Sequence, residues 1–268
     1  MSTSGFEGYQ ALAADMNELL HARVEAATPV ATLSERGNKL LQVMEGADDQ
    51  KFVTRSYTED SVTEIEKGLF VSGIEFSDAW EMLQRSMAAA EIPIVQSSLL
   101  EDVNGYPFVI VSEYIEGKPL SAASQEVKEE VAHGLGRLMV VNPNRGFVPH
   151  RAVLHQDMFV VGQRNGRDTA ILTDVDPYMH IKPRMKAEKM DADYIERVGA
   201  LIWDEWCSED EEERQEVLGA FIVEIADVSL DNFGMDSPRS AAFERIRMMH
   251  AGLDPRQLKV PLLVELVG

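Results

Sequence analysis

The sequence has little of what marks secreted and membrane proteins. Among its 268 residues Cys207 is the single cysteine, so the chain cannot form an internal disulfide. No apolar run approaches the roughly 18 residues that a membrane-spanning helix needs, and residues 1–10 lack a basic stretch followed by an apolar run. We therefore expect a cytoplasmic protein that does not bind a membrane.

Positive charge is also scarce. The chain carries 25 Lys and Arg against 46 Asp and Glu, which gives a formal net charge of −21. A nucleic-acid backbone would be repelled by this charge except at a local basic patch, and the sequence shows no such patch. We expect no nucleic-acid partner, and an anionic ligand would need a metal ion or nearby cationic side chains in order to bind.

The first part of the chain has the patterns of antiparallel hairpins. Hydrophobic residues make up 45% of the chain, which is ample for a buried core. Short apolar runs separated by polar turns predict four strands, Leu40–Met44, Lys51–Tyr57, Ile94–Leu100 and Tyr106–Tyr114. Asn104-Gly105 between the last two is a strong hairpin signal. Helices are expected over 6–24 and 77–90, the second with Ser77 as its N-cap.

The later part is mainly helical. Apolar spacing predicts helices over 125–140, 191–207, 208–228 and 239–251, and one strand pair over 158–162 and 169–173. The polar segment Glu116-Gly117-Lys118-Pro119 separates the two kinds of pattern. The expected fold class is α+β, with a sheet-rich part over 1–116 and a helical part over 117–268.

Three carboxylates lie at the ends of this later strand pair. Asp157 directly precedes one strand, and Asp174 and Asp176 follow the other. Paired strands would bring Asp157 near Asp174, and gathered carboxylates are tolerated where a divalent cation such as Mg²⁺ binds between them. The spacing is equally compatible with Asp174 and Asp176 capping the next segment.

Five patterns in a fixed order resemble the protein-kinase-like superfamily. They occur over about residues 33–206: Leu33–Lys39 with Gly37-Asn38, Arg55 with Glu81, Phe108–Ile115 followed by Glu116–Leu120, His150-Arg151-Ala152 followed by Asp157, and Asp174. The sequence is most similar to the bacterial aminoglycoside- and choline-phosphotransferase-like branch. The resemblance implies a two-lobed fold, with a small antiparallel-sheet N-lobe and a mainly helical C-lobe.

The resemblance also implies ATP and Mg²⁺ as cofactors, and a role for each matching residue. Gly37 and Asn38 would cover the phosphates, Arg55 would contact them, and Glu81 would orient Arg55. Backbone groups of Glu113 and Ile115 would hold the adenine. Asp157 and Asp174 would be the catalytic residues, and the metal ligands would be Asp157, Asp174 and Asp176.

Two departures from the family pattern leave the activity open. Ala152 stands where the catalytic loop has its aspartate, which accepts the hydroxyl proton, and Asp157 stands where it has a metal-binding asparagine. A shifted alignment with His155-Gln156-Asp157 as the catalytic triplet restores an aspartate but leaves no room for the asparagine. The chain is therefore expected to be either a phosphotransferase acting on a small molecule or a protein, or a pseudokinase that only binds.

Overall fold

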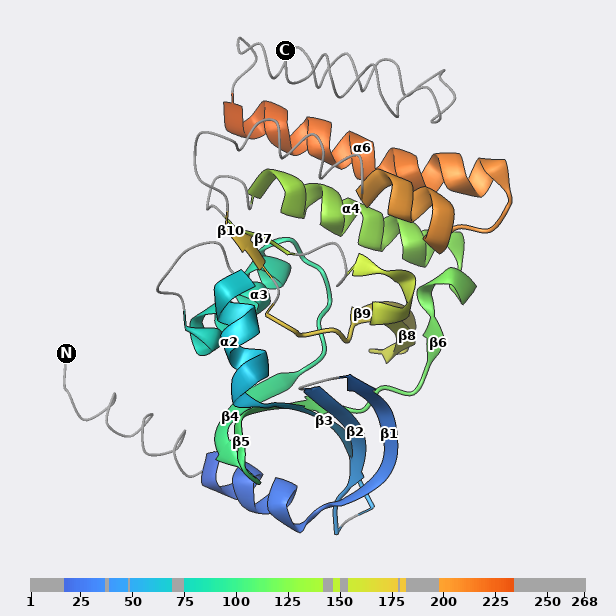
Figure 1. Cartoon of the computed structure of the whole chain (residues 1–268). Coiled ribbons are helices and arrows are strands. Elements are labelled where there is room, and N and C mark those ends of the chain that lie inside the picture. Colours follow the sequence, from blue (N-terminus) through green and yellow to red (C-terminus); the bar gives the residue numbers. More distant parts are fainter. Residues whose placement is uncertain are drawn as a thin grey trace, which may run out of the picture. The chain divides into compact units, whose positions relative to one another are not determined.

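The computed structural model describes residues 17–36, 39–47, 49–68, 75–141, 147–149, 154–177, 179–181 and 198–233 (Figure 1). The fold is a mixed α+β arrangement. Its residues group into two compact units, one of Met1–Glu66 with Val95–Tyr114 and one of Lys67–Ile94 with Ile115–Gly268. The chain crosses between the units after Glu66, Ile94 and Tyr114, and the sequence-based division at 116/117 lies close to the third crossing. The two parts expected from the sequence, 1–116 and 117–268, stay a prediction.

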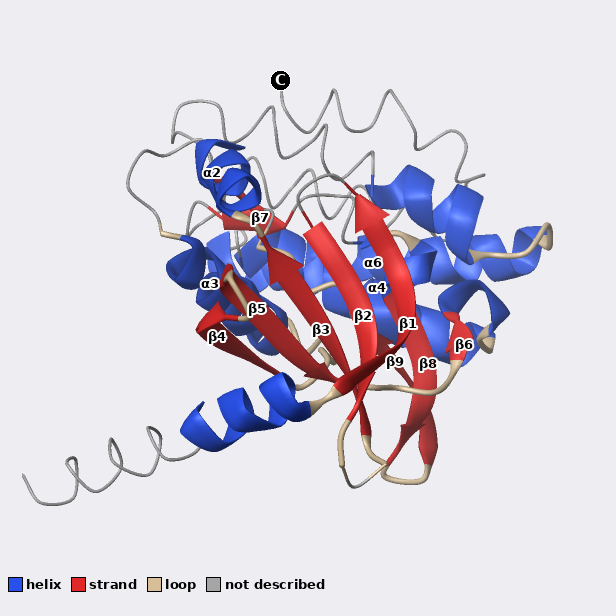
Figure 2. Ribbon diagram, turned by 60° about the horizontal axis from the view of Figure 1, so that its bottom comes forward, coloured by secondary structure: helices blue, strands red, loops and turns tan. Residues whose placement is uncertain are grey.

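An antiparallel sheet of five strands forms most of the first unit (Figure 2). Its strands lie in the order β1-β2-β3-β5-β4. Their bounds are β1 Thr28–Arg36, β2 Lys39–Glu45, β3 Lys51–Tyr57, β4 Ser97–Val103 and β5 Tyr106–Glu113. The four predicted strands are thus present within a few residues of their expected bounds. Strand β1 was not predicted, since the sequence there has no clear alternation of apolar and polar residues.

The β4–β5 hairpin forms at the predicted Asn-Gly turn. Asn104 and Gly105 both have positive φ, 52° and 81°, the backbone conformation that a type I′ turn requires. Adjacent pairs include Val103 with Tyr106 and Leu100 with Val109. The turn therefore fixes the register of the hairpin. In this register Leu100 and Val103 of β4 and the four consecutive residues 109–112 of β5 are buried.

The helix over residues 17–26 packs on this sheet through the apolar side chains Leu20 and Val24. The core beneath it contains Met44, Phe52, Leu100, Val103, Val109 and Val111. This is the later part of the helix predicted over 6–24, and residues 6–16 lie outside the described part of the chain. The three-and-four spacing of its apolar residues accounts for the packing.

A second helix, α2 (Glu59–Gly68), directly follows β3 and was not predicted. Thr58 caps its N-terminus, because its Oγ1 accepts a hydrogen bond from the Ser61 backbone N–H at 3.4 Å. Glu59 and Asp60 place negative charge in the first turn, where it is favourable. Ser61, Val62 and Ile65 are buried, so tertiary packing holds a helix that its own propensities would support poorly.

The second unit is mainly helical and contains two small sheets. Its long helices are α3 (Phe76–Ala89), α4 (Gln125–Val141) and α6 (Glu211–Phe233), and a π-helix, η6, spans Ile202–Trp206. One sheet pairs β7 (Phe147–Pro149) with β10 (Met179–Ile181). The other has the order β6-β8-β9, formed by Lys118–Pro119, Phe159–Arg164 and Arg167–Leu172. Short 3₁₀-helices occur at Leu120–Ala122 (η1) and Gln156–Met158 (η4).

Helix ends differ from the sequence predictions in two places. The predicted N-cap Ser77 lies inside α3, whose N-cap is Glu75 and makes no side-chain capping bond. Helix α6 begins at Glu211 rather than 208, and Asp210 caps it by accepting a bond from Glu212 N–H at 2.9 Å. The helix predicted over 239–251 lies outside the described residues.

A buried ion pair joins α4 to the start of α6. Lys128 Nζ donates to Glu213 Oε1 at 2.6 Å, and the two side chains are 2% and 14% exposed. Burial raises the pKa of Glu213, but hydrogen bonds from Lys128 and Ser208 outweigh it and hold this pKa below its ordinary value.

Burial beside Glu213 also raises the pKa of the Cys207 thiol to about 11, so Cys207 stays protonated at neutral pH as a small buried side chain.

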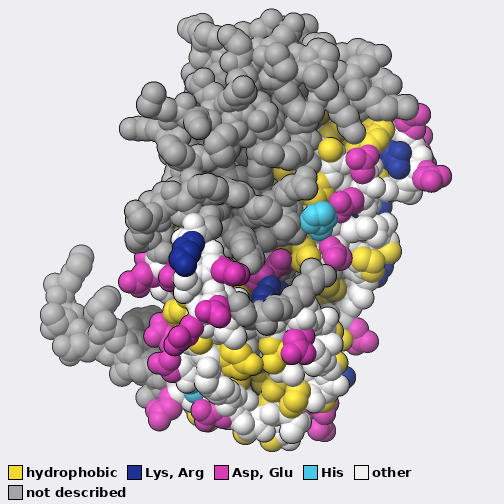
Figure 3. All heavy atoms as spheres, in the orientation of Figure 1, with side chains coloured by type: hydrophobic (Ala, Val, Ile, Leu, Met, Phe, Trp, Pro, Cys, Tyr) yellow, Lys and Arg dark blue, Asp and Glu magenta, His cyan; other side chains and the backbone are white. Residues whose placement is uncertain are grey.

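The acidic residues are spread widely over the surface. Figure 3 shows Asp and Glu side chains over much of the visible described face, with only isolated Lys and Arg among them. Among the residues whose side chains the structure describes, Asp174 and Asp176 are the buried carboxylates, and the other acidic side chains have contact with solvent. No helix in the described part of the chain has the length and apolar character needed to cross a membrane.

Candidate functional site

The buried carboxylates Asp174 and Asp176 follow the end of β9. They are only 8% and 2% exposed, which is unusual for aspartate. The Asp176 backbone N–H donates to Asp174 Oδ1 at 3.1 Å, so the two residues form a tight turn. Both residues make further polar interactions. Burying two carboxylates two residues apart is costly unless cationic or hydrogen-bonding groups compensate their charge.

Asp157 lies at the same end of the β8–β9 hairpin. Strand β8 begins at Phe159, which pairs with Leu172, the last residue of β9. One step beyond this pair, the N–H and Oγ1 of Thr173 both donate to the Met158 carbonyl, at 2.7 and 2.9 Å. The chain segments of Asp157 and Asp174 are thus neighbours, as the sequence predicts. The two residues differ in exposure, because Asp157 is exposed on η4 while Asp174 is buried.

A metal site of three protein side chains is not formed here. Among the residues that the structure describes, no three His, Cys, Asp or Glu side chains come together in a group that could hold a metal ion. Asp157, Asp174 and Asp176 suit Mg²⁺ only if one or two carboxylates share the ion with phosphate oxygens and water. This is the more common arrangement for Mg²⁺ in proteins. Magnesium binding by Asp174, with Asp157 or Asp176, stays a prediction.

The π-helix η6 holds the segment that leads into Asp157. Trp206 Nε1 donates to the Leu154 carbonyl at 3.2 Å, and its ring contacts Phe159 edge-on with centroids 5.5 Å apart. Next to it, Glu205 Oε2 lies 2.7 Å from His155 Nδ1. All these residues except Glu205 and His155 are fully buried. The sequence did not predict this support, because π-helices are rare. They often occur at functional sites.

Four of the predicted nucleotide-binding residues belong to the first unit, and the structure describes two of them, Arg55 and Glu113. Arg55 lies on β3 between Leu41 of β2 and Ile110 of β5, and it is buried. The Glu113 carboxylate accepts a bond from the Gln96 backbone N–H at 3.0 Å, and Glu113 N–H donates to the Gln96 carbonyl at the same distance. The Glu113 N–H is therefore already used within the sheet. Gly37 and Asn38 lie outside the described residues.

Glu81 and Ile115 belong to the second unit. Glu81 is exposed on α3, and its carboxylate accepts a bond from Arg85 of the same helix at 2.6 Å. Ile115 is half-buried, and a Cβ added at Gly162 would lie 2.8 Å from its Cγ2. The predicted pairing of Glu81 with Arg55 stays a prediction. Helix α2 offers an additional carboxylate that sequence reasoning missed, because Glu66 is half-buried there in the same compact unit as Arg55.

Comparison with known proteins assigns no family to this chain. No family model matches it, and no curated protein matches it either. Function must therefore be inferred from the residues themselves.

Proposed function

We propose that this chain is a kinase-like protein that binds ATP together with Mg²⁺. The observation that carries the proposal is the β8–β9 hairpin, which brings Asp157 and the buried Asp174 to one end of a strand pair. In protein kinases, the metal ions are held by an aspartate that follows the corresponding strand pair and by a residue of the catalytic loop. Asp174 is then the principal Mg²⁺ ligand, and Asp157 supplies a second carboxylate.

The negative charge of the protein bears on which groups could hold the phosphates of ATP. A chain with a net charge of −21 repels a triphosphate unless cationic groups and a metal ion compensate. Bound Mg²⁺ would neutralise charge on the phosphate oxygens. Arg55 is proposed as the phosphate contact, because in kinases the corresponding cation is on the third strand and Arg55 lies on β3. Glu81 and Glu66 are the candidates for orienting it.

Two activities are compatible with this nucleotide site. Phosphoryl transfer depends mainly on positioning and on stabilisation of charge, so a site without a catalytic-loop aspartate can retain it, and the acceptor would be a small molecule or a protein. The second candidate is a pseudokinase that binds a partner without transfer. Ala152 favours this candidate, because a methyl group can neither accept a proton nor orient a nucleophile.

Thermal stability in the presence of nucleotide tests the proposal. Wild type is expected to melt roughly 5 °C or more higher with ATP and Mg²⁺ at 100 times the Kd, since a ligand of the native state stabilises it by mass action. Asp174→Asn should lose most of this shift, while Asp168→Asn, an exposed change on the same hairpin, should keep it. An unchanged midpoint in wild type at all concentrations would reject the nucleotide site.

Consumption of ATP separates the two activities. Turnover by wild type that Asp174→Asn removes would establish the enzyme and exclude the pseudokinase. Binding of ATP without turnover, over a panel of small-molecule and protein acceptors, is the expected result for the pseudokinase.

A further inference from the structure

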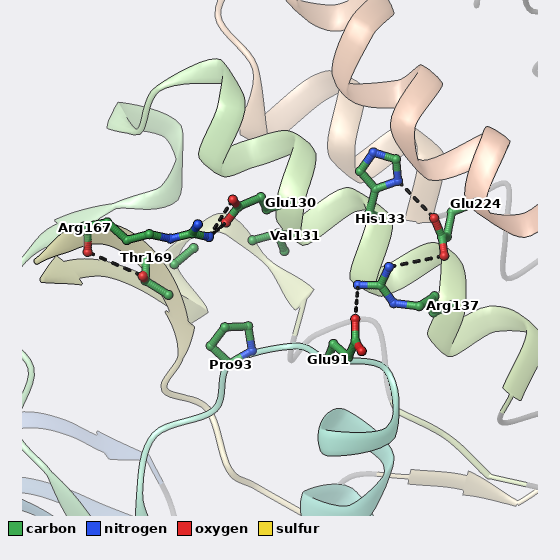
Figure 4. A pocket seen from close by; sticks show the side chains of 10 residues that line it. Glu91, Pro93, Glu130, Val131, His133, Arg137, Arg167, Thr169 and Glu224 are labelled. Carbon is green, nitrogen blue, oxygen red and sulfur yellow. Dashed lines mark hydrogen bonds and ion pairs between the residues drawn. The ribbon is translucent and has the colours of Figure 1, made fainter. Parts of the chain in front are cut away.

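A polar pocket in the second unit contains none of the proposed nucleotide-binding residues. Its volume is about 490 Å³, and its walls come from α4, α6, β9 and the turn after α3. Charged side chains form two groups at its opposite ends, with Val131 and Pro93 between them (Figure 4). Pro93 is half-buried and Val131 is buried, so apolar side chains line the part of the pocket between the two charged groups (Figure 4).

A network of four charged or titratable side chains forms one end. Arg137 donates from Nε to the Ala90 carbonyl at 3.1 Å and from Nη1 to Glu224 at 3.2 Å, and its Nη2 lies 3.3 Å from Glu91 Oε2. The other Glu224 oxygen lies 3.1 Å from His133 Nδ1. All three guanidinium nitrogens of Arg137 and both oxygens of Glu224 are thus engaged. Glu91, by contrast, is not fully engaged. Its side chain is 76% exposed, and of its two carboxylate oxygens only Oε2 has a partner among the described residues.

The opposite end has a single ion pair. Arg167 Nη2 donates to both oxygens of Glu130, at 2.6 and 2.7 Å. Within the described residues, Nε and Nη1 of Arg167 make no hydrogen bond, and the side chain is 66% exposed. Nε and Nη1 lie on different edges of the guanidinium group, so each can donate a separate hydrogen bond to an anionic oxygen. This end can therefore accept an anionic group without breaking an existing bond.

The backbone holds Glu91 in place at a cost. Glu91 has φ of 58°, a left-handed conformation in which glycine or asparagine is usual. Its N–H donates to the Ala88 carbonyl at 3.1 Å at the end of α3. A left-handed residue is common directly after the end of a helix, and here it sets the direction in which the chain leaves α3.

We propose that this pocket binds a small zwitterion with an apolar stem. An oxygen of the ligand's carboxylate or phosphate would accept a hydrogen bond from Nε or Nη1 of Arg167. Its ammonium would pair with the open oxygen of Glu91, and its stem would lie against Pro93 and Val131. The open anion-binding and cation-binding groups lie at opposite ends of an apolar surface, which is the complement of an ω-amino acid. The site stands apart from the proposed nucleotide site and does not depend on it.

Probes of matched length test the charge pattern. 4-Aminobutyrate, 6-aminohexanoate and 8-aminooctanoate would be titrated by ligand-observed NMR, with hexanoate and hexylamine as the single-charge controls. We expect one ω-amino acid to bind saturably with a Kd on the order of millimolar, as its size allows. Hexanoate and hexylamine should each bind at least about fivefold more weakly, since each lacks one ion pair.

Two variants test the assigned residues. Arg167→Gln and Glu91→Gln should each weaken the bound ω-amino acid about fivefold, while leaving the melting temperature almost unchanged because both side chains are exposed. Arg85→Gln, which removes an exposed arginine elsewhere in the unit, and Asp174→Asn should not change the affinity. The proposal fails if no ω-amino acid binds, if hexanoate or hexylamine binds equally well, or if neither Arg167→Gln nor Glu91→Gln weakens binding.

Discussion

Replacing Lys128 with methionine is expected to lower the free energy of unfolding by about 3–5 kcal/mol. The substitution leaves the Glu213 carboxylate, only 14% exposed, without the ammonium group that lies 2.6 Å from it. Methionine fills a similar volume, so the loss measures the ion pair rather than a cavity. Denaturant unfolding of the two proteins provides the measurement.

Two comparisons identify the cause of this loss. The double variant Lys128→Met/Glu213→Leu should recover most of the stability, because replacing both members of a buried pair by apolar groups is often neutral. Arg85→Met, which removes an exposed i,i+4 pair, should cost at most about 0.5 kcal/mol. A double variant less stable than Lys128→Met alone would contradict this account of the pair.

The effect of Lys128→Met should also depend on pH. The folded-state pKa of Glu213 lies below its ordinary value of 4.5, so the ionised pair contributes fully above about pH 4.5. Its contribution is lost as the pH falls through the lower folded-state pKa. The stability difference between wild type and Lys128→Met should therefore narrow below about pH 4.5.

Replacing Trp206 with alanine is expected to lower the free energy of unfolding by about 3–5 kcal/mol. The indole is fully buried, and its loss removes the ring contact with Phe159 and leaves the Leu154 carbonyl without its N–H donor. Trp206→Phe keeps an aromatic ring but not the donor, and it should cost about 1–3 kcal/mol. A cost below about 1 kcal/mol for Trp206→Ala would show that η6 does not support the segment before Asp157.

Local sequence signals were enough to predict three hairpins, β2–β3, β4–β5 and β8–β9, but not β1–β2. Asn104-Gly105 specifies its turn through backbone conformation alone, so the β4–β5 register follows from nearby residues. Helix α2 was missed although Thr58, Glu59 and Asp60 form a recognisable helix start. Its few apolar residues include β-branched Val62 and Ile65, which favour a helix only weakly, and both are buried in the folded protein.

The candidate site could be predicted only in part. The nearness of Asp157 and Asp174 follows from strand pairing, which alternating patterns reveal. Three features join residues that are tens of positions apart in the sequence. They are the Lys128–Glu213 ion pair, the hydrogen bond from Trp206 to Leu154, and the pocket between Arg167 and Glu91. Contacts of this kind depend on tertiary packing, and no local periodicity encodes them.

The magnesium dependence of ATP affinity is the most direct test of the proposed nucleotide site. The Kd for ATP would be measured by calorimetry for wild type and for Asp174→Asn, in excess Mg²⁺ and in excess chelator. We expect Mg²⁺ to tighten binding to wild type by about tenfold or more and to change binding to Asp174→Asn little, because Asp174 is the proposed link between protein and metal. Equal magnesium dependence in the two proteins, or no ATP binding to wild type, would contradict the account.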